Sequence, residues 1–157
     1  MNAAKADFLK NKFVSLLRKI PADKIPAWGK MNLQQMVEHF SDSVKIASGV
    51  TVVKEIITPE GNLQKMHSFL MSGKPFKENT LNPLLSKEPP PAKHATIEDA
   101  LTELQNEIDN FFSVFEHSDG SFTRNPFFGD LTFEMNVQLL HKHALHHLRQ
   151  FGVSPVM

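Results

Sequence analysis

The segment Thr132–Gly152, TFEMNVQLLHKHALHHLRQFG, contains both the pattern that predicts the fold and the residues that predict a site. Its apolar residues recur three or four positions apart, which is typical of an amphipathic helix packed on a core. They are Phe133, Val137, Leu140, Ala144, Leu148 and Phe151. Gly152 follows the last of them, where glycine often ends a helix. We therefore predict a helix from about Thr132 to Phe151.

Four of the eight histidines lie in this segment. His143 and His147 are four residues apart, which places their Cβ atoms about 5–6 Å apart on one side of a helix. Two imidazoles so spaced can hold one metal ion, as in the H-E-x-x-H helices of metalloproteases. Ala144 stands where that motif has its glutamate, which disfavours metalloprotease chemistry. Alternatively, the two rings only border a helix interface.

The angular positions on this helix separate the remaining two histidines from that pair. With about 100° per residue, His143 and His147 flank the apolar face. His146 is predicted to point toward solvent and His141 to lie on the opposite flank. Neither is expected to join the pair.

Three further helices follow from the same periodicity. One spans Ala3–Ile20 and ends at Pro21; another begins at Leu33, after Asn32 and Gln35 at capping-box spacing, and ends near Gly49. The third begins after Thr96 and extends to Phe115. Residues 50–93 give no firm assignment, and five of the ten prolines lie between Pro75 and Pro91. We predict one all-α domain over residues 1–157, a four-helix bundle with a long crossover between its second and third helices.

A third metal ligand has to come from another helix, and His39 is the best candidate. It lies at the edge of the apolar face of the second helix, beside Met36 and Phe40. The alternatives are a satisfied core histidine or a half-exposed one. Glu38 and Asp42 are candidate partners of the ligands or candidate bases. His67, His94 and His117 fall in segments predicted as loops exposed to solvent, with His67 as a reserve ligand.

Composition excludes several functions. The 17 basic residues balance the 17 acidic ones, which argues against a nucleic-acid partner. There is no cysteine, so disulfides, thiolate metal sites and a cysteine nucleophile are excluded. No apolar run approaches a membrane span, and the N-terminus lacks a signal-peptide pattern, so we expect no membrane partner and a cytoplasmic location. Phosphate-loop, nucleophile-elbow and di-iron patterns are also missing.

Two stretches resemble a known family. Trp28–Phe40, WGKMNLQQMVEHF, resembles the tryptophan-to-histidine signature in the second helix of the DinB/YfiT-like superfamily. Asn125–Thr132, NPFFGDLT, and Lys142–Gly152, KHALHHLRQFG, are similar to its DUF1569 branch. The resemblance extends in outline from about Lys24 to the last residue. It implies a four-helix bundle with a long crossover and a divalent metal, zinc or nickel, held by His39, His143 and His147.

The resemblance also implies an activity. Superfamily members include metal-dependent transferases that use low-molecular-weight thiols, such as bacillithiol-S-transferases and mycothiol-dependent isomerases. The resulting expectation is a thiol-dependent S-transferase, or a hydrolase with the same site, that acts on a small-molecule substrate. The alternative is a non-catalytic helical bundle that binds a small molecule or a protein. A homodimer formed through apolar helix faces is compatible with either function.

Overall fold

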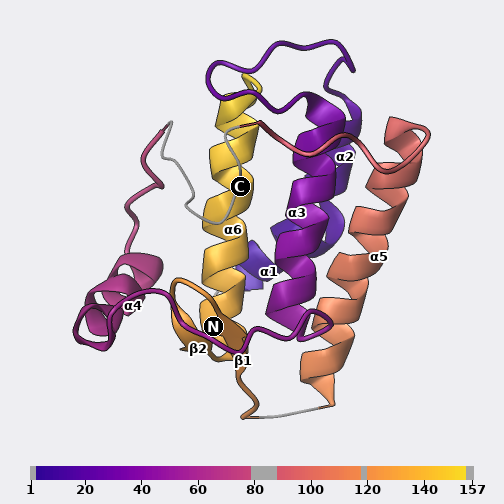
Figure 1. Ribbon diagram of the computed structural model, residues 1–157. Helices are drawn as coiled ribbons and strands as arrows, with labels where there is room; N and C mark the ends of the chain where they lie inside the picture. Colours follow the sequence, from indigo (N-terminus) through magenta and orange to yellow (C-terminus); the bar gives the residue numbers. More distant parts are fainter. Residues whose placement is uncertain (1–2, 79–87, 118–119, 155–157) are drawn as a thin grey trace.

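Figure 1 shows the computed structural model, which describes residues 3–78, 88–117 and 120–154. This part of the chain is mostly helical, with six α-helices, a short 3-10 helix and a sheet of two strands. The elements are α1 (Ala3–Asn11), α2 (Phe13–Arg18), α3 (Leu33–Ser48), η1 (Glu60–Asn62), α4 (Leu63–Met71), α5 (Ile97–Glu116), β1 (Thr123–Asn125), β2 (Gly129–Leu131) and α6 (Phe133–Gln150).

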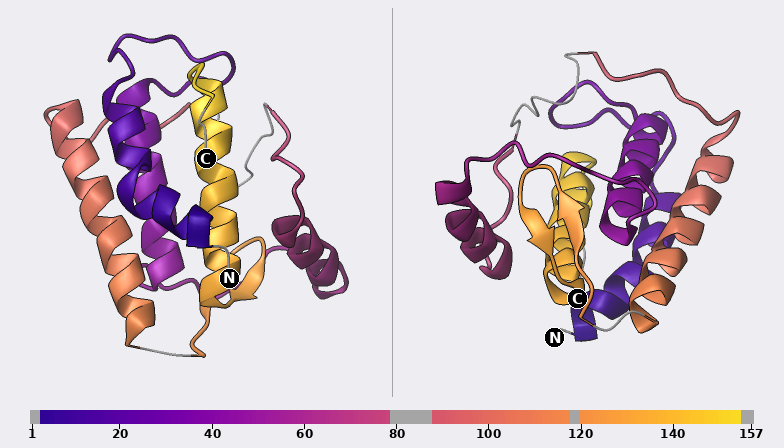
Figure 2. Two further views of the ribbon diagram at one scale, coloured as in Figure 1. Left: turned by 180° about the vertical axis from the view of Figure 1, so that it is seen from behind. Right: turned by 60° about the horizontal axis from the view of Figure 1, so that its bottom comes forward.

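The three long helices α3, α5 and α6 lie side by side, with α1 and α2 behind them (Figures 1 and 2). Helix α3 packs against both α5 and α6, while α1 packs against α6 and α2 against α5. Their apolar faces meet in one core, which includes Phe8, Phe13, Met36, Phe40, Leu104, Phe111, Ala144 and Leu148. This arrangement brings α3 and α6, the two helices that contain the predicted ligands, into direct contact.

The predicted starts of the three long helices are confirmed. Asn32 and Gln35 form a reciprocal capping box at the start of α3. Thr96 and Thr132 each accept a backbone N–H three residues ahead, which satisfies one free donor in the first turn of α5 and α6. Helix α3 ends at Gly49, whose φ of 86° is the left-handed conformation that favours glycine.

The single helix predicted over Ala3–Ile20 is wrong, because the chain turns at Lys12 and forms α1 and α2. Phe8 and Phe13 are both fully buried, with ring centroids 6.1 Å apart. Residues five apart on a regular helix point about 140° away from each other. The departure from helical geometry at Lys12, with φ −123° and ψ −34°, lets both rings enter the same core.

The crossover between α3 and α5 contains more structure than the sequence predicts. It includes η1 and α4, and residues 79–87 of the predicted proline-rich stretch lie outside the described residues. Leu70 of α4 is buried in a second, smaller apolar cluster with Phe128, Leu131 and Leu139. Helix α4 thereby packs against α6.

The all-α prediction is also corrected by a short hairpin before α6. Strands β1 and β2 pair antiparallel, with Thr123 opposite Leu131 and Asn125 opposite Gly129. The predicted turn at Asn125-Pro126 connects them, and Oδ1 of Asn125 accepts the N–H groups of Phe127 and Phe128. Within the described residues, the helices are too short or too polar to cross a membrane.

Candidate metal centre

Three histidines from two helices meet where α3 contacts α6. One ring nitrogen of each of His39, His143 and His147 lies within 4.8 Å of the others. Nε2 of His143 is 2.7 Å from Nε2 of His147, and the His39 ring centroid is 5.3 and 5.4 Å from those of His143 and His147. The structure thus brings together the three residues that helix spacing and position had selected.

The orientation of His147 is fixed by Gln150. Nδ1 of His147 is 2.7 Å from Oε1 of Gln150, and Nε2 of Gln150 donates to the carbonyl of Trp28 at 2.9 Å. An amide oxygen only accepts, so Nδ1 of His147 is the protonated nitrogen. Its Nε2 consequently directs a lone pair toward His143 and His39. Helical periodicity alone does not reveal this role of Gln150, although its position three residues after His147 places it on the same side of the helix.

Burial keeps all three imidazoles neutral. Burial, followed by the neighbouring His39 ring, lowers the pKa of His147 to about 3. Burial is also the largest cause that lowers the pKa of His143, well below its ordinary value, and that of His39. The charge of Asp42 acts in the opposite direction on His39. Near pH 7 the three rings therefore offer unprotonated nitrogens.

Aromatic side chains surround this cluster. The Phe40 ring is stacked on His143, with 4.8 Å between centroids, and Phe76 meets His143 edge-on at 6.2 Å. His146 does not point into solvent as predicted: it is half-buried, with its ring 5.4 Å from Trp28 and 6.0 Å from Phe76. Trp28 and Phe76 come from the α2–α3 loop and from the crossover, whose paths the helical periodicity could not predict.

The two acidic candidates have different surroundings. The Glu38 carboxylate is buried and accepts the backbone N–H groups of Lys93 and His94 at 2.7 and 3.0 Å. Burial raises the pKa of Glu38, but these hydrogen bonds outweigh it and the net shift is downward. Glu38 therefore fastens the end of the crossover to α3. Asp42 is exposed and lies 3.9 Å from Nζ of Lys93.

The other histidines lie outside the triad. His141 is buried against Phe8. His67 is on α4 rather than in a loop, where its Nε2 donates to the carbonyl of Phe128 at 2.6 Å. His94 is half-buried and lies 3.2 Å from Glu103, so of the three predicted loop histidines only His117, at the end of α5, is exposed.

The triad fits a divalent metal by the chemistry of its donors. Neutral imidazole nitrogens are preferred ligands of zinc and nickel, and three of them leave a coordination position open. Nε2 of His143 and Nε2 of His147, 2.7 Å apart, face the same point, where a cation would bind. The Gln150 amide supplies the hydrogen bond that metal-binding histidines usually make through their other nitrogen.

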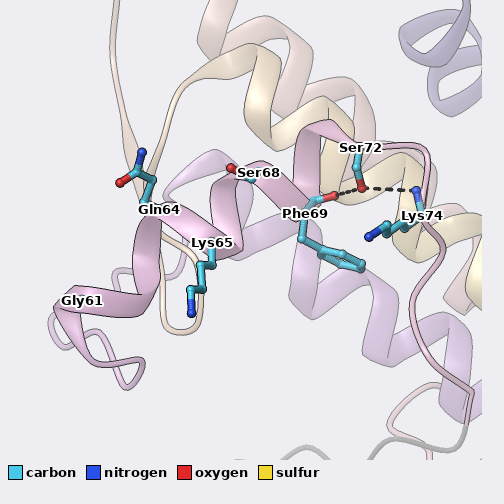
Figure 3. Close-up of a pocket in the computed structure, with 7 residues that line it drawn as sticks. All are labelled: Gly61, Gln64, Lys65, Ser68, Phe69, Ser72 and Lys74. Atoms are coloured by element: carbon cyan, nitrogen blue, oxygen red, sulfur yellow. Dashed lines mark hydrogen bonds between the residues drawn. The ribbon is translucent and has the colours of Figure 1, made fainter.

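A separate hollow lies along α4 (Figure 3). It has a volume of about 520 Å³ and is lined by Gly61, Gln64, Lys65, Ser68, Phe69, Ser72 and Lys74. None of these residues belongs to the triad. Nζ of Lys142 on α6 donates to the carbonyls of Ser72 and Lys74 and lies over the Phe69 ring, so this lysine fastens the segment after α4 to α6.

The fold and the cluster define a mainly helical protein with a triad of neutral histidines between two helices, of which His147 is buried and His39 and His143 are half-buried. Residues 10–153 match the family model described as "Protein of unknown function (DUF1569)". The chain therefore belongs to the DUF1569 family. Neither the curated proteins nor the solved structures include a match to this chain.

Proposed function

We propose that this chain is a divalent-metal-dependent enzyme of the DinB/YfiT-like superfamily, with a four-helix bundle formed by α1–α2, α3, α5 and α6. His39, His143 and His147 are its metal ligands, and zinc or nickel is the ion. The observation that carries the proposal is the convergence of three ring nitrogens within 4.8 Å from helices α3 and α6. The lowered pKa values of all three rings support it, since metal ligands must be unprotonated.

The reaction that this site supports best is transfer of a low-molecular-weight thiol to an electrophilic small molecule, or hydrolysis at the same site. A divalent ion held by three neutral ligands keeps its charge and lowers the pKa of a bound thiol or water to near neutrality. The residues of the chain orient the reacting groups. Gln150 keeps the proton of His147 on Nδ1, and the rings of Phe40 and Phe76 limit water around His143.

One observation favours the alternative, a bundle that binds a small molecule or a protein without catalysis. Among the residues described in the structure, the one buried acidic side chain is Glu38, and its carboxylate points to the crossover rather than to the triad. A general base beside the ligands would have to be Asp42, which is exposed. The two functions therefore differ in whether the metal-loaded protein converts a substrate into product.

The test is adduct formation by metal-loaded protein. Zinc- or nickel-loaded wild type is incubated with a panel of small thiols and an electrophile, and the conjugate is quantified by mass spectrometry. We expect conjugation above the uncatalysed rate with at least one thiol, and none with His143→Ala. His117→Ala, which changes an exposed histidine outside the triad, is the matched control and should match wild type. A loaded wild type that conjugates or hydrolyses nothing would favour the binding protein.

A further inference from the structure

Two buried polar atoms next to the triad have no hydrogen-bond partner within the part of the chain that the structure describes. They are Nδ1 of His146 and Nη2 of Arg149. Nearly all buried polar groups in proteins are paired, because leaving one unpaired costs about 1–3 kcal/mol and more for a charged group. Both residues lie on α6, three positions apart, so they are neighbours on the same side of the helix.

The ring of His146 adjoins the candidate metal centre. The His146 ring centroid is 5.2 Å from that of the ligand His147. The rings of Trp28 and Phe76 lie on His146, at 5.4 and 6.0 Å, and both are half-buried. A small molecule that reached His146 and Arg149 would therefore lie beside the triad.

We propose that His146 and Arg149 form a subsite for an oxyanion, and that the chain binds a small molecule with a carboxylate group. A guanidinium N–H can only donate, so its missing partner is an acceptor, and its charge favours an anion. Its planar fork fits the two oxygens of a carboxylate. Nδ1 of His146 supplies a second donor in the tautomer that has its proton on Nδ1. The subsite consists of residues of the chain alone and does not require the metal.

Two charged side chains near the subsite affect anion binding in opposite directions. Burial is the largest cause that lowers the pKa of His146, and the positive charge of Arg149 lowers it further. The carboxylate of Glu78, which is exposed, raises it. Glu78 makes no hydrogen bond to either unpaired atom. Its negative charge therefore opposes an incoming anion. Because both donor atoms are covered, the anion enters by displacement of a side chain, and the Trp28 and Phe76 rings are the ones that lie on His146.

The test is a titration of metal-free protein with acetate, followed by the ¹H–¹⁵N resonances of the His146 imidazole and the Arg149 guanidinium. Sodium chloride at matched ionic strength is the control for screening. We expect saturable shifts with acetate, with a Kd on the order of 1 mM, and none with chloride. Arg149→Gln should weaken acetate binding about tenfold or more, and Arg149→Lys, which keeps the charge but loses the fork, by a smaller factor.

Two further variants complete the test. Arg124→Gln is the matched control, since that guanidinium is paired with Asp130 on the hairpin, and it should bind acetate as wild type does. Glu78→Gln should bind acetate more tightly. Shifts that do not saturate, or saturation that is unchanged in both Arg149 variants, would overturn the subsite. Because the protein is metal-free, this outcome is independent of whether the triad holds an ion.

Discussion

Nδ1 of His147 donates a hydrogen bond to Oε1 of Gln150 across 2.7 Å, and the same amide donates to the carbonyl of Trp28. The loop before α3 thereby determines which nitrogen of a candidate ligand is free. Gly29 makes this approach feasible: a Cβ there would lie 2.9 Å from Nε2 of Gln150, and its φ is 81°. The contact links residues more than 120 positions apart in the chain.

Gln150→Leu removes the acceptor of the Nδ1 proton while keeping a side chain of similar size. We expect zinc affinity to fall about 10–100-fold, the usual effect of losing such a partner of a metal-bound histidine. Gln150→Glu keeps an acceptor and should retain most of the affinity. Competition with a chromophoric chelator measures both. Equal affinity in Gln150→Leu and wild type would mean that Gln150 does not orient His147.

The pH dependence of zinc binding follows from the lowered pKa values of the triad. Protons compete with zinc only below the pKa of a ligand, and burial lowers the pKa of all three histidines. Zinc affinity should therefore change little between about pH 8 and the ordinary histidine value of about 6.5, and fall only at more acidic pH. Calorimetric titrations across this range check the curve. A steep loss of affinity already above that value would contradict ligands that are neutral near pH 7.

His141 should make the metal-free protein sensitive to acid. Burial, with help from Lys5 and Lys142, lowers its pKa to about 4, so between its ordinary value of 6.5 and about 4 the unfolded chain binds more protons than the folded one. As the pH is lowered through this range, the free energy of unfolding then decreases by about 1.4 kcal/mol per pH unit, or about 3 kcal/mol in all. Urea denaturation at several pH values should give a shallower slope for His141→Leu. Identical slopes would exclude this contribution.

The capping box at the start of α3 stabilises the helix that contains His39. Asn32→Ala removes the side-chain acceptor of the Gln35 N–H and should lower the free energy of unfolding by about 1 kcal/mol. Asn62 is the matched control, since it precedes α4 without a side-chain capping bond. Asn62→Ala should change stability by less than about 0.5 kcal/mol. Thermal denaturation compares the two, and equal losses would argue against the cap.

The sequence predicted the triad because the required information is local. His143 and His147 are four residues apart on one helix, and His39 borders the apolar face of another. The capping residues Asn32, Thr96 and Thr132 likewise act within their own first turns. Periodicity and capping rules describe interactions of this range, so α3, α5 and α6 begin where predicted.

The missed features depend on contacts between distant segments. Helix α4 has nine residues, and its burial rests on Leu70 packing beside Phe128 and Leu139, which no local pattern reveals. The half-buried state of His146 depends on Trp28 and Phe76, 118 and 70 positions earlier in the chain. The break at Lys12 has the same origin, since both Phe8 and Phe13 enter one core.

The most direct test of the metal centre is metal content by inductively coupled plasma mass spectrometry on untagged wild type, His143→Ala and His117→Ala. The triad predicts about one zinc or nickel ion per chain in wild type and in His117→Ala, and loss of the ion in His143→Ala. A wild type that remains empty after loading with zinc, nickel and manganese, or a His143→Ala variant that keeps its ion, would contradict a metal site formed by His39, His143 and His147.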